Sequence, residues 1–460
     1  MSSRHKITLV FFLLIVLFFG MGLLWSTFRT HPIGQIKPIE TGTTQYPSPL
    51  VTAGICTPWK QVNTNAFGLP SEFDSSNRPI TPSSETPFQS EEGFEVLVFK
   101  GQLYLGMEAD NIFGARLWRT RNGVTAPQTQ LDWEEVAADQ AGCPFGICDT
   151  AQADHVDSLA EFQGWIYVSL ANRSGSPQGT LVFRSPSGDP DTWEDALAKI
   201  GPGFSKSQNE NFKDMQVFDG HLCGGTWNEV DGAEVWCTTD GFNWQQKNLS
   251  GFGEVDNIVI WSGHVFKGQL YFGVQNTSQD GETTHGRLYR TDSLDQDQPA
   301  WEEVFRSTPG ISWGNILGDL NGYLYISTPS PEGMRVYRSS SGDANTWEIT
   351  SLPGFENDPT NWSVLADGAT VYQGALYAGV VNGQHTFNLW RTTGDHSEDS
   401  QIVSWEQIPT TEILDPYNIY AQLIAFNERL YAWTSNPVHG QQVWQTFCGE
   451  IPEGQVSDAP

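Results

Sequence analysis

FKGQLYFG (266–273), GRLYRT (286–291) and AWEEV (300–304) make up the stretch from which the fold can be predicted. Two apolar runs flank a glycine turn, a third run ends in Arg-Thr, and a fourth opens on a tryptophan. Short alternating runs of this kind are typical of β-strands, and the tight turn joins the first two as a hairpin. The stretch therefore predicts one antiparallel sheet of four strands.

The same unit recurs along the chain at intervals of about 48–63 residues, which suits a four-stranded propeller blade. Its turn falls at Gly101, Gly164, Gly220, Gly268, Gly322, Gly374 and Glu428. The tryptophan of the fourth strand recurs at Trp133, Trp193, Trp244, Trp301, Trp347 and Trp405. The last copy lacks this strand, but Trp59–Val62 near the N-terminus matches it. We therefore predict an all-β fold, a seven-bladed β-propeller whose ring is closed by the N-terminal segment.

The predicted domain boundaries follow from these repeats and from composition. They are a membrane anchor or signal segment (1–25), a Thr/Pro-rich stalk (26–53), the propeller (54–449) and a tail (450–460). Within the propeller we distinguish the closing strand (54–68), a linker (69–92) and the blades (93–449).

The N-terminal run Ile7–Trp25 carries no charge over about 19 residues, close to the length that spans a bilayer. It lacks a cleavage site of small residues, which favours an uncleaved transmembrane helix over a signal peptide. The two alternatives predict a membrane-anchored propeller outside the cytoplasm or, if the segment is cleaved, a secreted one.

The six cysteines each have one plausible partner once the repeats are aligned. The predicted disulfides are Cys56–Cys448 across the last blade, Cys143–Cys148 in a loop and Cys223–Cys237 on adjacent strands. Three disulfides indicate an oxidising compartment.

The formal net charge of −30 bears on the partners. An acidic surface repels phosphate backbones, which excludes nucleic acid as an expected partner. No sequence motif calls for a cofactor, and no spacing demands a metal ion. The nearest approach to a metal-ligand set is Asp149, Asp154, His155 and Asp157.

Three segments between the third and fourth strands place Ser or Thr, then Asp, then Trp: 187–193, 238–244 and 341–347. They resemble the Asp-box, S-x-D-x-G-x-T-W, of sialidase-like propellers. The spacing from Asp to Trp is four residues here and five in that family. The resemblance implies that the Asp stabilises a turn and the Trp packs between blades.

The resemblance does not extend to sialidase activity. The segment containing Arg184 looks like the F-R-I-P segment of that family, but the same position holds arginine in other blades, at Arg119, Arg290, Arg338 and Arg391. A residue repeated around the ring is expected to be architectural. No nucleophilic Tyr–Glu pair can be identified.

Asparagine also repeats, shortly after the second strand of most blades, at Asn172, Asn228, Asn276, Asn382 and Asn436. We expect these side chains to stabilise the strand ends. Four asparagines lie in N-x-S/T sequons: Asn172, Asn248, Asn276 and Asn361.

Residues that do not repeat are better candidates for a binding site. They lie just before the first strand of each blade, at one mouth of the central channel, which we call the upper mouth. The ligand-binding candidates are Asp157, Glu210 and Asp256 from the acidic blades, and Trp313, Trp362 and Tyr420 from the aromatic blades. Such a site suits a polyol or a cation-bearing ligand. The alternative is that the acids solvate loops and the aromatic rings fill the channel.

The predicted function is non-catalytic binding of a carbohydrate or protein partner by a membrane-tethered, extracytoplasmic propeller. The alternative is a propeller glycoside hydrolase or lyase that uses carboxylates at the mouth. Two carboxyl groups about 5–9 Å apart in a deep cleft would favour the hydrolase.

Overall fold

The computed structural model describes residues 56–68, 93–108, 114–138, 143–147, 155–173, 175, 177–277, 284–382, 387–393, 403–413, 415, 417–436 and 439–448. The chain divides into two units, Met1–Pro49 and Leu50–Pro460, and all of these residues belong to the second. The predicted anchor, stalk, linker and C-terminal tail all lie outside the described residues. Among the residues that the structure describes, no helix is both long and apolar enough to cross a membrane.

The fold is all-β, and its strands form antiparallel groups of four in which neighbours in sequence are neighbours in the sheet. The first two groups are β2 (Gly93–Phe99), β3 (Gln102–Met107), β4 (Arg116–Thr120) and β5 (Trp133–Glu135), then β6 (Val156–Phe162), β7 (Trp165–Leu170), β8 (Leu181–Ser185) and β9 (Glu194–Asp195). The next two are β10 (Asn211–Phe218), β11 (His221–Trp227), β12 (Val235–Thr238) and β13 (Trp244–Gln246), then β14 (Asn257–Phe266), β15 (Gln269–Asn276), β16 (Arg287–Thr291) and β17 (Glu302–Arg306). A single pairing, Trp227 with Val259, joins these two groups into one eight-stranded sheet.

The remaining groups complete the domain. They are β18 (Asn315–Leu320), β19 (Tyr323–Thr328), β20 (Arg335–Ser339) and β21 (Glu348–Ile349), and β22 (Asn361–Tyr372), β23 (Ala375–Asn382), β24 (Phe387–Thr393) and β25 (Ser404–Ile408). The last group is β26 (Tyr420–Phe426), β27 (Arg429–Ser435), β28 (Gln442–Thr446) and, from the start of the chain, β1 (Lys60–Gln61). Short 3₁₀ turns lie at η1 (Asn65–Gly68), η2 (Gln130–Asp132), η4 (Pro202–Ser205) and η5 (Ser250–Gly253).

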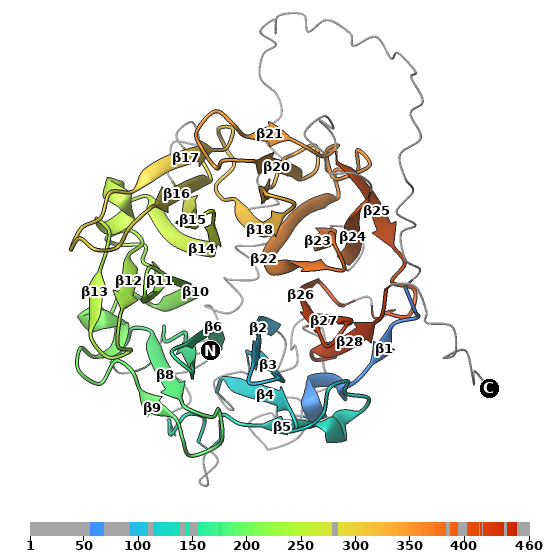
Figure 1. Cartoon of the computed structure of the whole chain (residues 1–460), viewed down its shortest axis with the longest axis horizontal. Helices are drawn as coiled ribbons and strands as arrows, with labels where there is room; N and C mark the ends of the chain where they lie inside the picture. The colour runs from blue at the N-terminus through green and yellow to red at the C-terminus, as the bar shows by residue number, and fades with distance from the viewer. Residues whose placement is uncertain are drawn as a thin grey trace, which may run out of the picture. The chain divides into compact units, whose positions relative to one another are not determined.

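The first strand of each group packs against the first strand of the next, and β26 packs against β2 (Figure 1). These inner strands therefore form a closed ring with the other strands outside it, which is the arrangement of a β-propeller. The apolar core lies between neighbouring sheets. One cluster, for example, joins Leu117 of β4 to Val156 of β6 and Val168 of β7, all fully buried.

The N-terminal segment closes the ring as predicted. Lys60 pairs with Gln445 and Gln61 with Trp444, so β1 is the outer strand of the last group. A hydrogen bond that repeats around the ring also shows that this segment is equivalent to the fourth strand of the other groups. Trp193 Nε1 donates to Val136 O at 2.8 Å, Trp244 Nε1 to Ala196 O at 3.2 Å, and Trp301 Nε1 to Lys247 O at 2.8 Å. Trp133 Nε1 donates in the same way to Val62 O, at 2.9 Å, in the closing segment.

The repeated arginines are architectural, as predicted. Arg119 of β4 contacts Glu134 of its own group at 2.8 Å and Asp189 of the next group at 2.6 Å. Arg290 likewise bridges Glu302 at 2.9 Å and Asp343 at 2.6 Å. Each guanidinium thus joins the third strand of one group to the Asp-containing turn of the next.

One of the three Asp-containing turns, 238–244, has the role expected of it, whereas the carboxylates of Asp189 and Asp343 bind the arginines described above. Asp240 accepts hydrogen bonds from the backbone N–H groups of Phe242 at 2.9 Å and Asn243 at 2.8 Å, and Thr238 Oγ1 accepts one from Gly241 N at 2.9 Å. These contacts stabilise the turn locally. Membership of an Asp-box family stays a prediction.

Two of the predicted disulfides are present. Cys56 is bonded to Cys448 across 392 residues of sequence, and Cys223 to Cys237 across 14. Cys143 is disulfide-bonded as well, while Cys148 lies outside the described residues. Disulfides persist in oxidising surroundings, so the propeller is an extracellular or secreted domain.

Candidate functional site at the channel mouth

We call the turns between the first two strands of each group the lower turns, since they lie at the end of the channel opposite the upper mouth. Counted back from the residue that precedes each lower turn, the inner strands place side chains in two layers of the channel. Five positions back lie Asp157, Lys213, Trp261 and Asn315. Lys213 Nζ bonds Asp157 Oδ1 at 2.8 Å, and the same ammonium lies 5.0 Å from the ring centroid of Trp261. This layer therefore links successive blades through charge and cation–π contacts.

Four positions back lie Glu95, Ser158, Asp214 and Ser262. Ser158 Oγ accepts a hydrogen bond from Met215 N at 2.8 Å, and Ser262 Oγ accepts one from Ile316 N at 3.0 Å. Asp214 Oδ2 likewise accepts one from Gly263 N. A side chain of each of these three inner strands, β6, β10 and β14, thus binds the backbone of the next strand around the ring.

Three carboxyl groups meet in this part of the channel: Glu95 of β2, Asp214 of β10 and Asp367 of β22. Glu95 is 8 % exposed, and its carboxyl group is hydrogen-bonded to that of Asp367. Burial, with the charges of Asp367 and Asp214 beside it, raises the pKa of Glu95 well above its usual range. Burial and the neighbouring Asp367 raise the pKa of Asp214 to about 7. We call these three residues the channel carboxyl cluster.

Asp157, one of the predicted site residues, lies beside Lys213 and His155 rather than beside other acids. Its carboxylate accepts hydrogen bonds from Asn211 Nδ2 at 2.9 Å and Lys213 Nζ at 2.8 Å, and His155 Nε2 lies 2.9 Å away. Burial acts to raise its pKa, but Lys213 and His155 outweigh burial and lower the pKa below its usual range. Asp157 is 1 % exposed and is therefore an ionised internal residue rather than one open to a ligand.

The other predicted acids lie nearer the surface. Glu210 is half-buried and Asp256 is exposed, and the backbone carbonyl groups of both accept hydrogen bonds from the ends of second strands, from Asn172 N at 3.0 Å and Thr277 N at 2.9 Å. Their positions agree with the loops of the upper mouth. The side chain of Asp256 is open to solvent there.

The predicted aromatic residues divide into two kinds. Trp313 and Trp362 are half-buried, and their rings meet edge to face with centroids 6.3 Å apart and an interplanar angle of 85°. Tyr420 is only 7 % exposed, so it does not present an open ring as expected. It begins β26, where neighbouring inner strands pack on both sides of it. The structure thus brings together Trp313 and Trp362, which are contributed by successive blades.

A second aromatic pair, Trp227 and Trp261, was not predicted. The ring centroids are 5.6 Å apart, and a cationic side chain lies against each ring. Arg173 lies 5.1 Å from the Trp227 ring, and Lys213 lies 5.0 Å from that of Trp261. Aligning the inner strands from their lower turns would have placed Trp261 beside Lys213. These cation–π contacts indicate that the pair stabilises the channel wall.

The repeated asparagines are structural, as expected. Asn228 Nδ2 donates to Asn209 Oδ1 at 2.9 Å and Asn436 Nδ2 to Asn418 Oδ1 at 3.0 Å; the two further pairs have the same geometry, Asn276 with Asn257 and Asn382 with Asn361. The four sequon asparagines, Asn172, Asn248, Asn276 and Asn361, are at most 1 % exposed. None of the four is accessible to a glycan in the folded domain.

The Glu95–Asp367 pair does not have the geometry of a glycosidase. Glu95 and Asp367 are hydrogen-bonded to each other directly, which is closer than the separation that either hydrolytic mechanism uses. Among the described residues no set of three or more His, Cys, Asp or Glu has a metal-binding arrangement. Asp149 and Asp154, from the predicted metal-ligand set, lie outside them.

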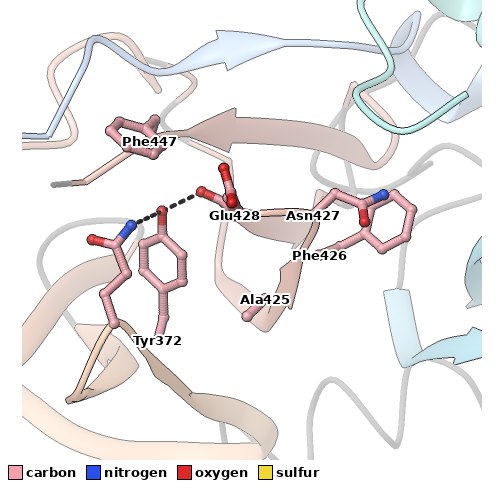
Figure 2. A pocket seen from close by; sticks show the side chains of 7 residues that line it. Tyr372, Ala425, Phe426, Asn427, Glu428 and Phe447 are labelled. Atoms are coloured by element: carbon pink, nitrogen blue, oxygen red, sulfur yellow. Dashed lines mark hydrogen bonds between the residues drawn. The ribbon is translucent and has the colours of Figure 1, made fainter. Parts of the chain in front are cut away.

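A pocket of about 490 Å³ lies on the opposite face, beside the lower turns of β22–β23 and β26–β27 (Figure 2). Its wall includes Tyr372, Phe426 and Phe447. The Tyr372 hydroxyl accepts a hydrogen bond from Gln373 Nε2 at 3.1 Å and donates one to Glu428 O at 2.6 Å (Figure 2). It therefore already has hydrogen-bond partners within the protein. The upper mouth remains the better candidate site.

No protein-family model matches the chain, and no curated protein matches it significantly. Solved structures with a similar fold include the polysaccharide lyase Uly1, at 11 % identity and a TM-score of 0.47 over 87 % of this chain and 98 % of that one. The sialidase of Trypanosoma rangeli has 13 % identity and a TM-score of 0.42 over 84 % and 58 %. The β-propeller domain of the Trilobed protease from Pyrococcus furiosus has 10 % identity and a TM-score of 0.44 over 81 % and 99 %. These similarities concern the fold alone, and a function has to be argued from the residues of the channel mouth.

Proposed function

We propose that this protein is a seven-bladed, extracytoplasmic β-propeller that binds a carbohydrate at the upper mouth of its channel without cleaving it. The Trp313–Trp362 pair carries this proposal. Both rings keep part of their surface open to solvent, and they meet edge to face, which offers two differently oriented apolar faces within one site. A pyranose ring has an apolar C–H face that stacks on such surfaces and hydroxyl groups around its edge that need polar partners.

Polar groups that can bind those hydroxyl groups lie on the loops of the same mouth. Asp256 is exposed and Glu210 is half-exposed on the loops of the same mouth. A carboxylate accepts two or more hydrogen bonds, so each can orient a sugar by its hydroxyl groups. A protein ligand would instead need a larger apolar surface, and it is a separate outcome of the test.

The test is a glycan array and a pull-down from a protein library with the wild type and the variants Trp313→Ala and Trp362→Ala. Trp165→Ala is the matched control, because Trp165 is also half-buried but begins β7 next to a lower turn. We expect at least tenfold weaker glycan binding for the two mouth variants, corresponding to about 1.4 kcal/mol each, and unchanged binding for the control. Equal glycan binding by all four proteins would overturn the proposal.

A second candidate, a polysaccharide-cleaving enzyme, is favoured by one observation. Asp214, with its pKa raised to about 7, and the ionised Asp157 lie on adjacent inner strands, and carboxyl groups with opposed pKa shifts can serve as acid and base. Release of new sugar ends from a polysaccharide panel by the wild type, lost in Asp214→Asn, would support the enzyme and exclude simple binding.

Attachment to a membrane is also part of the proposal. The uncharged run Ile7–Trp25 supports an uncleaved anchor. The mature protein should then pellet with membranes and retain its N-terminus in an intact-mass measurement, whereas a mature N-terminus near residue 30 would show that the protein is secreted.

A further inference from the structure

Most of the described inner strands contain a bulge, and the bulge of β22 is the largest of them. Val364 pairs with Val380 and Ala369 with Ala378, so four residues (365–368) face the single residue Gly379. Asp367 in this bulge has a φ of 54°, a left-handed conformation that aspartate and asparagine tolerate better than most residues. β22 also contacts β2 and β14, which are not its neighbours in the ring. The bulge therefore reaches across the channel.

The carboxyl group of Asp367 is what meets β2. It lies beside the carboxyl group of Glu95, and two buried carboxyl groups this close repel each other when both are ionised, which favours a proton on one of them. A second observation also indicates bound protons. Gln422 lies at the same register position as Glu95, on the strand between β22 and β2, and is 2 % exposed. Its Oε1 atom has no hydrogen-bond donor among the described residues, so a proton donor in this layer would satisfy it.

We infer that the channel carboxyl cluster is a proton latch that holds the bulge of β22 against β2 and thereby regulates ligand binding at the upper mouth. The regulation of that site rests on the proposed function. Trp362 is three residues before the bulge on the same strand and contacts Trp313 of the preceding blade. With the proton bound, the bulge is fixed and the two rings keep their arrangement. With the proton lost, Glu95, Asp214 and Asp367 repel one another and the bulge separates from β2.

The charges around the cluster set the direction of the switch. Lys213 of β10 is the cation that favours ionisation of all three carboxyl groups, but it also bonds Asp157 of β6 at 2.8 Å. From the remaining elements, His155 of β6 contacts Asp157, and His264 of β14 contacts Asp319 of β18 at 2.9 Å. Strand β26 contributes no charged side chain. One lysine shared with a fourth carboxylate does not neutralise three buried acids. Burial therefore raises the pKa values of all three, and repulsion from neighbouring acids adds to the rise at Glu95 and Asp214.

Hydrogen exchange measured by mass spectrometry tests the latch without a ligand. After correction for intrinsic rates, exchange of the peptide covering 361–372 should be about tenfold faster at pH 8 than at pH 6 in the wild type, because losing one linked proton changes an opening equilibrium by up to tenfold per pH unit above its pKa. In Asp367→Asn the side-chain amide can still hydrogen-bond to Glu95, tolerates the positive φ and carries no charge. This variant should show less than about a twofold change. Glu161→Gln, at an exposed acid of the inner strand β6, is the control and should behave as the wild type.

Equal exchange of this peptide at the two pH values in the wild type would overturn the latch, as would an undiminished pH dependence in Asp367→Asn. Glycan-array binding at pH 6 and pH 8 separates the latch from the proposed function. Binding that weakens with the release of the bulge supports both. A working latch with no glycan bound at either pH refutes the proposed function alone. Glycan binding that is equal at both pH values while the bulge opens refutes the regulation alone.

Discussion

The Cys56–Cys448 bond should contribute more to stability than any other crosslink of the described domain, because it spans 392 residues. A disulfide restricts the unfolded chain, and the restriction grows with the loop that it closes. In the chain-entropy model the contribution is about 6 kcal/mol for a separation of 392 residues and about 3 kcal/mol for the 14 residues between Cys223 and Cys237. With an unfolding entropy of about 0.8 kcal/mol/K for a domain of this size, these values correspond to about 7 °C and about 4 °C in Tm.

The assay is calorimetry of two double variants, Cys56→Ala/Cys448→Ala and Cys223→Ala/Cys237→Ala, which leave no unpaired thiol. The first variant should still fold, because β1 pairs with β28 and Trp133 still bonds Val62 O. A Tm that falls as far or farther in the second variant would refute the loop-entropy reasoning. A free thiol at Cys56 in the non-reduced wild type would refute the pairing itself.

Three further outcomes are expected. Trp362→Ala should lose glycan binding with a Tm close to that of the wild type, whereas Trp390→Ala, at a ring only 2 % exposed, should cost about 3–5 kcal/mol of unfolding free energy in urea denaturation. Asn361→Ala should lower the unfolding free energy by about 1–3 kcal/mol, because it removes a buried amide that bonds Asn382 and Gly354 O. Since Asn361 is buried, peptide mass mapping of the wild type from a glycosylating host should show no glycan on it. The unfolding free energy should fall as pH rises from about 4 to about 7, since the folded state holds the Asp214 proton up to about pH 7 and the unfolded state releases it near 3.8; urea titrations at a series of pH values should show a shallower fall in Asp214→Asn.

The fold could be predicted in detail because each blade carries its own local pattern. The hairpin turn, the arginine that ends the third strand and the tryptophan that opens the fourth all lie within one repeat. The closing strand could be found for the same reason, since Trp59–Val62 keeps the pattern of an outer strand although its partner Gln445 lies far away in the chain.

A further repeat was present and went unrecognised. A phenylalanine with positive φ follows the fourth strand in several groups and stacks on an aromatic ring of the next, as Phe204 does on Trp236 at 4.7 Å and Phe252 on Tyr289 at 4.1 Å. The Gly-Phe dipeptide at Gly203, Gly251 and Gly354 was the signal for it.

The candidate site was predicted less well, for a physical reason. Whether Asp157 points to a ligand or to Lys213 depends on a side chain of another blade, and a single repeat does not contain that information. The meeting of Glu95 and Asp367 depends on a bulge in β22 and on contact between strands that are not neighbours in the ring. Trp313 and Trp362 could be placed at the same mouth because Trp313 lies just before β18 and Trp362 near the start of β22, the inner strands of successive blades.

The pairing of Lys60 with Gln445 also has a consequence for how the protein is made. A ribosome delivers β1 before any of the blades, and its partner β28 is the last of the described strands to emerge. The early strand therefore has to stay without its partner, as an exposed edge that other chains can pair with, while some 380 residues are synthesised. Contacts of such long range form slowly, so the docking of β1 on β28 is expected to be a late step of folding. A nascent chain that stalls before β28 would leave β1 as an unprotected strand, and the quality-control machinery of the secretory route would meet this protein first through that strand.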